Sequence, residues 1–212
     1  MDFTASFLGL SPTVLAEILS RENIMHRSIH GLWPNMPRIA GPAYPVRCGL
    51  GDNLMLHAAI YRAPRGAVIV CQAGDDDYAV AGGNVCAIAQ KNGIAGFVID
   101  GVVRDIAEIR ANHFPVYARG LMPIPASKNA VGVMNSPIQC GGVDVRPGDM
   151  IVADEEGVVV VPWARLEEVL TKALDKAARE AADGLDVWAA NHKKNVEDIM
   201  SAKGLADHLS IP

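Results

Sequence analysis

The feature that most constrains the fold is an alternation of apolar runs and helical stretches between residues 67 and 118. Three runs rich in β-branched or aromatic residues have the composition of strands, and they lie at 67–71, 95–99 and 114–118. Helical spacing separates them, first with Val85, Ile88 and Ala89 on one face and then over 106–112. This order predicts an α/β fold with parallel strands joined by right-handed crossovers.

The loops after the first two of these strands are expected to lie together. In a parallel sheet the loop after each strand emerges at the same edge, and open α/β sheets bind ligands at that carboxyl edge. We therefore expect the segments 73–83 and 100–105 to face each other, although they are distant in the sequence.

This edge carries residues suited to an anion and to a divalent cation. Gly82 and Gly83 precede a helix, whose first amide groups lack partners within the helix and attract a carboxylate or a phosphate. Arg104 offers a fork of hydrogen-bond donors, and Asp105 beside it offers a hard oxygen ligand. One pocket can therefore hold an anion together with a metal ion.

Purely structural explanations of the same residues remain open. The two glycines can simply allow a tight turn, while Arg104 and Asp105 can form an ion pair at the start of the following helix, with Asp105 as its capping residue. The acidic run 75–77 at the same edge fits either a solvated turn or an additional group of metal ligands.

Composition and charge argue against several classes of function. The 212-residue chain has a net charge of −5 and no basic stripe, so we expect no nucleic-acid and no anionic-membrane partner. No apolar run approaches the length of a membrane span, and the start of the chain lacks the positive region of a signal peptide, so a cytoplasmic protein is expected. The four cysteines form no C-x-x-C pair, which argues against a zinc site, and Cys71 and Cys86 are predicted to be core residues.

The segments before this unit predict helices and an irregular stretch. Residues 11–21 begin with a cap candidate and a proline and continue with helical spacing, which predicts a short amphipathic helix. The segment 29–45 contains four prolines, so we expect little regular structure and a path over the surface or toward a neighbouring subunit. A helical run follows with Asp52 or Asn53 as its cap, and His57 on it is expected to be a core or subunit-contact residue.

The segments after this unit predict a second β-layer and a helical end. Loop and edge-strand composition over 122–143 gives way, over 141–162, to strands separated by Pro-Gly-Asp and Asp-Glu-Glu-Gly turns. Residues 163–182 are clearly an amphipathic helix, and 183–212 predict another helix that packs on the body or on a partner subunit. No linker separates two cores, so a single domain over 1–212 is predicted.

The spacing between the glycines and the Arg-Asp pair matches that of a known family. Gly83 is followed after twenty residues by Arg104 and Asp105, and Glu108 stands three residues further on. At these positions the chain resembles the RraA-like family, and the further matching segments are 38–43, 51–52, 98–105, 114–120 and 142–162. This family includes class II 4-hydroxy-4-methyl-2-oxoglutarate and 4-carboxy-4-hydroxy-2-oxoadipate aldolases, proteins named as regulators of ribonuclease activity A, and members with an old demethylmenaquinone methyltransferase label.

The resemblance covers about residues 30–175 and implies a fold and an assembly. It implies a layered α/β/β domain of the swivelling, phosphohistidine-domain-like type with N- and C-terminal helices. The core would occupy about 30–175, and a C-terminal helical extension about 183–212. It further implies a homo-oligomer, either a trimer or a dimer of trimers, with the site near a subunit interface.

The resemblance also assigns roles to single residues, with Arg104 and Asp105 as the catalytic pair. The residues expected to bind a small 2-oxo acid, through backbone amides or the guanidinium group, are Gly82, Gly83, Asn84, Val85 and Arg104. Asp105 would anchor Mg²⁺ or Mn²⁺, and Glu108 would either support the metal site indirectly or face solvent.

These roles imply a divalent-metal-dependent lyase that cleaves a C–C bond of a short 2-oxo acid to give pyruvate. Aldol cleavage of 4-hydroxy-4-methyl-2-oxoglutarate and decarboxylation of oxaloacetate both leave a pyruvate enolate, whose charge a divalent cation stabilises. No lysine lies in the matching motifs to form a Schiff base, and Lys91 and Lys128 are expected on the surface or in loops. Asn84 departs from the aldolase pattern, because an acidic residue is associated with this helix start and asparagine cannot act as a base.

The family names imply two other functions. The first is a non-catalytic protein that binds and inhibits a ribonuclease, and the absence of a basic surface fits contact with protein better than with RNA. The second, a methyltransferase, is disfavoured because no glycine-rich loop follows a first strand with a later acidic ribose ligand.

Overall fold

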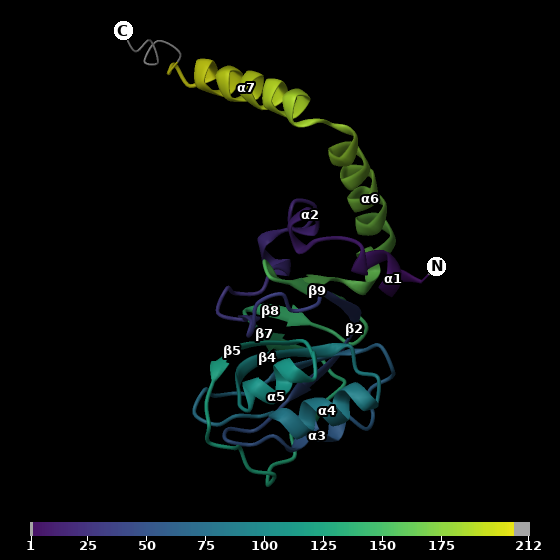
Figure 1. Ribbon diagram of the computed structural model, residues 1–212, viewed down its shortest axis with the longest axis vertical. Coiled ribbons are helices and arrows are strands. Elements are labelled where there is room, and N and C mark those ends of the chain that lie inside the picture. Colours follow the sequence, from purple (N-terminus) through teal and green to yellow (C-terminus); the bar gives the residue numbers. More distant parts are fainter. Residues whose placement is uncertain (1, 206–212) are drawn as a thin grey trace. The chain divides into compact units, whose positions relative to one another are not determined.

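The computed structural model describes residues 2–205, which form a mixed α/β structure (Figure 1). The α-helices are α1 (Phe3–Leu8), α2 (Pro12–Ala16), α3 (Leu54–Ala59), α4 (Gly83–Lys91), α5 (Ile106–Ala111), α6 (Leu166–Ala182) and α7 (Leu185–Ala202). Short 3₁₀ turns are η1 (Arg21–Asn23) and η2 (Trp163–Arg165). The strands are β1 (His30–Gly31), β2 (Ile39–Arg47), β3 (Val68–Gln72), β4 (Gly96–Val103), β5 (Val116–Leu121), β6 (Val133–Met134), β7 (Ile138–Cys140), β8 (Val143–Val145), β9 (Met150–Asp154) and β10 (Gly157–Val161).

The main sheet contains the predicted parallel unit. Its strand order is β1-β5-β4-β3-β2-β9-β10, and β2, β3, β4 and β5 run parallel to one another. Helix α4 connects β3 to β4, and α5 connects β4 to β5. The expected alternation over 67–118 is therefore confirmed, with β4 longer than its apolar run because it continues to Val103. Strand β2, which precedes the predicted unit, supplies a fourth parallel strand.

The expectation for the proline-rich segment 29–45 was wrong, because most of its second half belongs to β2, which is largely buried in the sheet. A proline lacks the N–H group that a ladder requires, so it is tolerated only where that group has no partner. The Cys48 N–H donates a hydrogen bond to the Gln72 carbonyl of β3. Backbone N–H groups point alternately to the two sides of a strand, so the ring nitrogen of Pro45, three residues earlier, points away from β3. Pro42 is the last residue paired with β9, one position before pairing with β3 begins.

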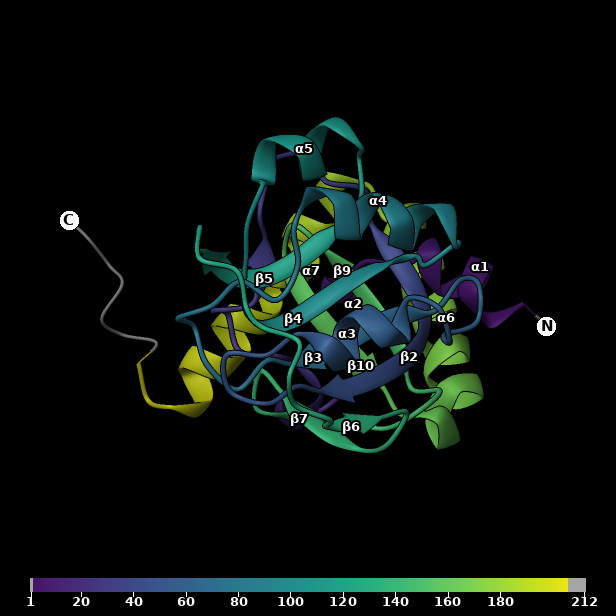
Figure 2. The same cartoon turned by 90° about the horizontal axis from the view of Figure 1, so that it is seen from below.

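The sheet has a separate hydrophobic cluster on each face. Ile69 and Cys71 of β3 pack in the cluster that α3, α4 and α5 cover, and Figures 1 and 2 show these helices on the same side of the sheet. Val68 and Val70, whose side chains alternate with these, pack in the other cluster with residues of β7 to β10. Helices, sheet and further β-structure therefore form the predicted α/β/β layers.

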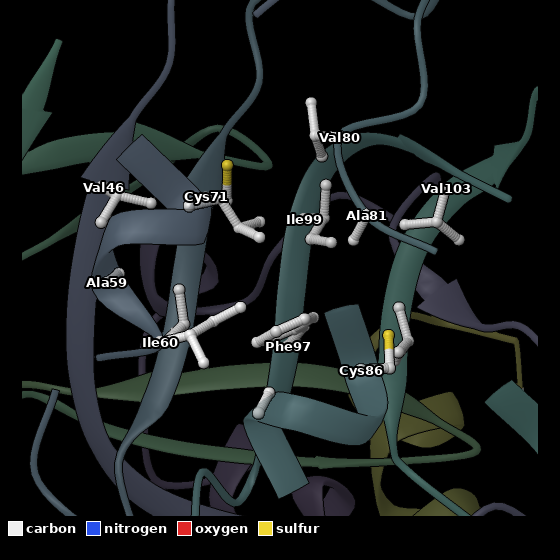
Figure 3. Close-up of a cluster of buried hydrophobic side chains, with 14 of the residues drawn as sticks. Val46, Ala59, Ile60, Cys71, Val80, Ala81, Cys86, Phe97, Ile99 and Val103 are labelled. Atoms are coloured by element: carbon white, nitrogen blue, oxygen red, sulfur yellow. The ribbon is translucent and has the colours of Figure 1, made fainter. Parts of the chain in front are cut away.

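The helix-covered cluster underlies the loops of the parallel unit (Figure 3). Cys71 and Cys86 are fully buried among its aliphatic and aromatic side chains, which confirms their prediction as core residues. Burial raises the pKa of the Cys86 thiol to about 12, with a smaller contribution from Asp105. This thiol is therefore protonated at neutral pH and packs as a small apolar side chain.

The second β-layer follows the predicted strand-and-turn pattern. Strands β7 and β8 form a two-stranded sheet, and β9 and β10 form an antiparallel pair that joins the main sheet through β2. The buried Asp149 fixes the turn before β9, because its carboxylate accepts hydrogen bonds from the N–H groups of Arg146 and Trp163. Gly157 begins β10 at φ +133°, a conformation that favours glycine.

The ends of the chain are helical, as predicted. Helix α2 is shorter than the expected 11–21, with Ser11 as its cap and Pro12 at its first position. Compact packing divides the described residues into two units, whose boundary lies between residues 173 and 174. The boundary falls within α6, whose buried residues all belong to the first unit.

Helix α7 accounts for the described part of the predicted C-terminal extension, and residues 206–212 of that prediction lie outside the described residues. No α7 residue is buried, and what this helix packs against stays a prediction. Among residues 2–205 no helix is both long and apolar enough to cross a membrane.

Candidate functional site

The two loops predicted to face each other are in direct contact. The Gly83 N–H at the start of α4 donates a hydrogen bond to Asp105 Oδ2 at 3.1 Å. The Arg104 N–H donates to the carbonyl of Ala81 at 3.0 Å, and Arg104 Nε lies 3.4 Å from Asp105 Oδ2. Segments that are more than twenty residues apart in the sequence thus meet at the carboxyl edge of β3 and β4.

The glycines are required by this close approach and do more than form a turn. A Cβ on Gly82 would collide with the carboxylate of Asp105 and would lie 3.0 Å from Arg104 Cγ. A Cβ on Gly83 would collide with the carboxylate of Glu108 and would lie 2.7 Å from its Cβ. Any larger residue at either position would push α4 away from the Arg-Asp loop.

Asp105 has a backbone conformation that turns its side chain toward α4. It occupies the left-handed region at φ +60° and ψ +40°, which is uncommon for a residue with a Cβ and costs about 1–2 kcal/mol. It stands at the N-cap position of α5, yet its side chain makes no capping hydrogen bond to that helix. The alternative is therefore confirmed for the position of Asp105 and for its ion pair with Arg104, but not for capping by its side chain.

A small cavity of about 180 Å³ opens beside this contact. The predicted site residues that line it are Gly82, Asn84, Val85, Arg104 and Asp105. Gly83 and Glu108 do not line the cavity. The Gly83 N–H is not free for a ligand, because it donates its hydrogen bond to Asp105. The amide groups of Asn84 and Val85 belong to the first turn of α4, where amides have no partner within the helix, so an anion can use them.

Two further polar residues of the cavity come from α3 and were not predicted. Asn53 precedes this helix with 4% exposure, and its Nδ2 donates to the Ala126 carbonyl at 3.4 Å. Its Oδ1 is buried without a hydrogen-bond partner in the described structure, and so is Nε2 of His57, which lines the same cavity. His57 thus borders the cavity, so it is not a residue of the closed core, and its contact with another subunit stays a prediction.

Lys128 is the third polar residue of the cavity that was not predicted there. It is exposed as expected, but the loop that carries it closes the cavity. The buried Asp52 holds this loop, because Oδ2 accepts hydrogen bonds from Ser127 Oγ and the Ala130 N–H while Oδ1 accepts from the Leu54 N–H. Burial alone would raise the pKa of Asp52, but these hydrogen bonds outweigh it and lower the pKa.

Comparison with known proteins identifies the family. The family model described as Aldolase/RraA matches residues 12–160. The chain belongs to the RraA-like family. A protein of Halalkalibacterium halodurans, provisionally named as a 4-hydroxy-4-methyl-2-oxoglutarate aldolase, is 41% identical over 183 residues, which make up 86% of this chain and 87% of that protein. The resemblance drawn from the glycine and Arg-Asp spacing is thereby confirmed.

Two solved structures have the same fold. An uncharacterised protein from Pseudomonas syringae pv. tomato matches with a TM-score of 0.76 and 28% identity, over 84% of each chain. RraAS2 of Streptomyces coelicolor, described as an unusual member of the RNase ES inhibitor RraA protein family, matches with a TM-score of 0.75 and 27% identity. The second match covers 85% of this chain and 95% of that one.

The charge state of His57 in this RraA-like protein follows from its surroundings. Burial lowers the pKa of the imidazole, and the nearby Lys128 cation lowers it further. A hydrogen bond with the backbone of Val80 and the charge of Asp52 oppose this shift without reversing it. The imidazole is therefore neutral at pH 7, so one of its nitrogens is able to accept a proton.

The carboxylates of the RraA-like site fit some metal ions and not others. Asp105 is the only carboxylate among the described residues that line the cavity. The carboxylate of Glu108 lies close to Gly83, outside the lining. Over residues 2–205 no group of three His, Cys, Asp or Glu side chains is arranged to hold a metal. This donor set suits Mg²⁺, which commonly binds one or two carboxylates and keeps several waters, and does not suit a structural zinc ion.

The acidic run 75–77 serves as a turn. Asp75 Oδ2 accepts a hydrogen bond from the Gly51 N–H at 2.6 Å, and Oδ1 accepts from the Asp77 N–H at 3.0 Å. Asp76 is paired with Arg119 at 3.3 Å. Of the two interpretations of this run, the structure therefore supports the turn.

Proposed function

We propose that this RraA-like protein is a divalent-metal-dependent lyase that cleaves a C–C bond of a short 2-oxo acid and releases pyruvate. The candidate reactions are aldol cleavage of 4-hydroxy-4-methyl-2-oxoglutarate and decarboxylation of oxaloacetate. The observation that carries the proposal is one small cavity in which Arg104, Asp105 and the first amides of α4 converge. The provisional aldolase name of the relative at 41% identity supports it.

Substrate binding follows from the donors around the cavity. The amides of Asn84 and Val85, at the positive end of the α4 dipole, receive the carboxylate of the 2-oxo acid. Arg104 can supply two parallel N–H groups to the carboxylate and the adjacent carbonyl oxygen. A cavity of about 180 Å³ lies below the usual range for drug-sized ligands, in keeping with a substrate of few carbon atoms.

Asp105 would hold Mg²⁺ or Mn²⁺, and Glu108 would support the site from its position over Gly83. A bound divalent cation supplies Lewis-acid stabilisation of the enolate oxygen that forms in either reaction. The hydrogen bond from Gly83 fixes Asp105 Oδ2 in place before any ligand binds. This fixed position is what the reaction requires of a group that stabilises developing charge.

We also propose that the protein acts as a trimer or a dimer of trimers. Large apolar side chains are exposed on the loops around the cavity, including Leu50 at 78% and Val131 at 86% exposure. Exposed apolar groups of this size are typical of surfaces that another chain covers. Light scattering tests the assembly, and a monomeric protein would contradict it.

Pyruvate release tests the lyase function directly. Purified protein is incubated with either substrate in the presence of Mg²⁺, of Mn²⁺ or of EDTA, and pyruvate is measured. We expect metal-dependent release from at least one substrate, and its loss with EDTA. A folded preparation that releases no pyruvate from either substrate with either metal would contradict the proposal.

A second candidate is a non-catalytic protein that binds a ribonuclease and inhibits it. The observation that favours it is the similarity to Streptomyces coelicolor RraAS2, described as a member of an RNase inhibitor family. Inhibition of a purified RNase ES in an RNA-cleavage assay, combined with absent pyruvate release, would support this candidate over the lyase.

A further inference from the structure

The side of the cavity next to α3 contains two polar atoms that have no hydrogen-bond partner in the described structure. Asn53 Oδ1 and His57 Nε2 are both buried and lack a hydrogen-bond partner in the described structure. They are one helical turn apart, since the His57 N–H donates to the Asn53 carbonyl at 3.1 Å. Buried polar atoms nearly always have a hydrogen-bond partner in native proteins, so two such atoms at one cavity indicate a place for a polar group, either a water or part of a ligand.

Aldol cleavage needs a base that the rest of the cavity does not offer. The hydroxyl group on C4 of the substrate must lose its proton as the C3–C4 bond breaks. Asn84 at the start of α4 cannot accept a proton, and the carboxylate of Asp105 already bonds the Gly83 N–H and Arg104. Lys128 and Arg104 present N–H donors to the cavity and no acceptor.

We propose that His57 is the general base of aldol cleavage at this site, an inference that rests on the proposed lyase function. The imidazole takes the proton from the C4 hydroxyl group while the C3–C4 bond breaks. C4 becomes the carbonyl carbon of the first product, and the bonding electrons leave C3 as part of the pyruvate enolate. The protonated imidazole then returns the same proton to C3, so that no proton is gained or lost overall.

The charges that face His57 favour this role. Lys128 lies close enough to disfavour the imidazolium ion, and Asp52 acts weakly in the opposite direction. Arg104 and Asp105 are the other charged groups that line the cavity. Asn53 Oδ1 accepts a hydrogen bond from the substrate in the same region, which makes Asn53 a positioning residue.

Comparison of the two reactions separates this role from a structural one. Decarboxylation of oxaloacetate breaks a C–C bond without deprotonating a hydroxyl group, and solvent can protonate the resulting enolate. We expect His57→Gln to lower kcat for cleavage of 4-hydroxy-4-methyl-2-oxoglutarate by at least about 100-fold. Decarboxylation of oxaloacetate by the same preparation should fall by less than about tenfold, since it needs no base.

Hydrogen exchange at the methyl group of pyruvate gives a second readout. A group that protonates C3 of the enolate must also remove that proton in the reverse direction. In D₂O with Mg²⁺, the wild-type protein should therefore exchange the methyl protons of pyruvate, and His57→Gln should slow this exchange to a similar extent as cleavage. His30→Gln is the matched control, because His30 has an exposed side chain outside the cavity and should leave all three rates unchanged.

The outcomes distinguish the two proposals. Wild-type protein that releases no pyruvate overturns the lyase function and the role of His57 with it. Active wild-type protein whose His57→Gln variant loses both reactions equally, or neither, overturns only the role of His57. If the variant does not fold, the pH dependence of the wild type decides, because kcat for cleavage should fall below a pKa lower than the ordinary 6.5. Cleavage that does not fall at any acidic pH at which the protein stays folded would then overturn the role, since a catalytic base must lose its proton to act.

Discussion

The substitution Asp105→Asn separates the structural role of this side chain from its proposed role in metal binding. The ion pair with Arg104 contributes only on the order of 0–1 kcal/mol, because the two side chains are 36% and 41% exposed. Asparagine tolerates the left-handed φ of +60° better than most residues, and its amide oxygen can still accept the Gly83 N–H. We therefore expect the free energy of unfolding to fall by about 1 kcal/mol at most, a shift in Tm of about 2–4 °C.

The catalytic effect should be much larger than the effect on stability. Replacement of a charged oxygen ligand by an amide weakens the hold on a divalent cation, so Mn²⁺ affinity and kcat/KM should each fall at least about tenfold, or about 1.4 kcal/mol. Calorimetric titration with Mn²⁺ and the pyruvate assay measure the two quantities. The Asp105→Ala variant should lose both Mn²⁺ affinity and pyruvate release. Its free energy of unfolding should also fall by about 2 kcal/mol, because the hydrogen bond from Gly83 is removed and alanine is unfavourable at positive φ.

The matched control for this experiment is Asp76→Asn. Asp76 is half exposed, pairs with Arg119 and does not line the cavity, so its substitution should change neither Mn²⁺ affinity nor turnover. If Asp105→Asn retains wild-type Mn²⁺ affinity and kinetics, the assignment of Asp105 as the metal ligand is refuted, whatever the protein catalyses.

Substitutions at three further positions, Arg104, Gly83 and Asp52, test other parts of the site. Arg104→Ala should lower kcat/KM at least about tenfold, and Arg104→Lys should restore only part of it, because an ammonium group lacks the planar fork; equal activity of all three proteins would argue against a carboxylate clamp. Gly83→Ala should destabilise the fold by about 1–3 kcal/mol, since its Cβ meets Glu108, as measured by urea unfolding. Gly120→Ala, where a Cβ meets nothing within 4 Å, is the control and should unfold like the wild type. Asp52→Asn should cost about 2–3 kcal/mol at pH 7, because buried N–H groups lose an acceptor. The folded-state pKa of Asp52 is lowered, so its stabilising effect is present above the unfolded value and is lost as pH falls through the folded value. Wild type and variant should therefore differ in unfolding free energy at pH 7 and become similar in acid, and a difference that stays constant with pH would contradict this account.

The parallel unit was predictable because its signals are local. Alternating apolar runs and helical spacing over 67–118 are set by the side chains themselves, and the edge at which loops meet follows from strand direction. Strand β2 was missed for the opposite reason. Its prolines disfavour a strand when the segment is considered alone. In the sheet, pairing of β2 with β9 ends at Pro42 and pairing with β3 begins at Ala43, so the N–H groups that the prolines lack are not needed by either neighbouring strand.

The cavity was predicted only in part, because one side of it depends on tertiary contacts. Arg104 and Asp105 stand out in the sequence through their spacing from Gly83, and the structure brings the three together. Asn53 and His57 also had a signal, namely two polar residues four apart at the start of an apolar helix. That pattern alone did not show which side of the sheet the helix would cover, and so a core or subunit-contact role for His57 was preferred to a catalytic one.

The loop that carries Lys128 connects the two sides of the cavity through backbone hydrogen bonds. Ala79, ahead of α4, donates to the Ile124 carbonyl at 2.7 Å and accepts from the Ala126 N–H at 3.0 Å. The Asn53 N–H, ahead of α3, donates to the Ser127 carbonyl at 2.8 Å. Because these bonds use main-chain atoms, the loop keeps its place when its exposed side chains change. Differences in substrate preference among variants of this loop should therefore come from the side chains that it presents to the cavity, with the Arg104–Asp105 contact left intact.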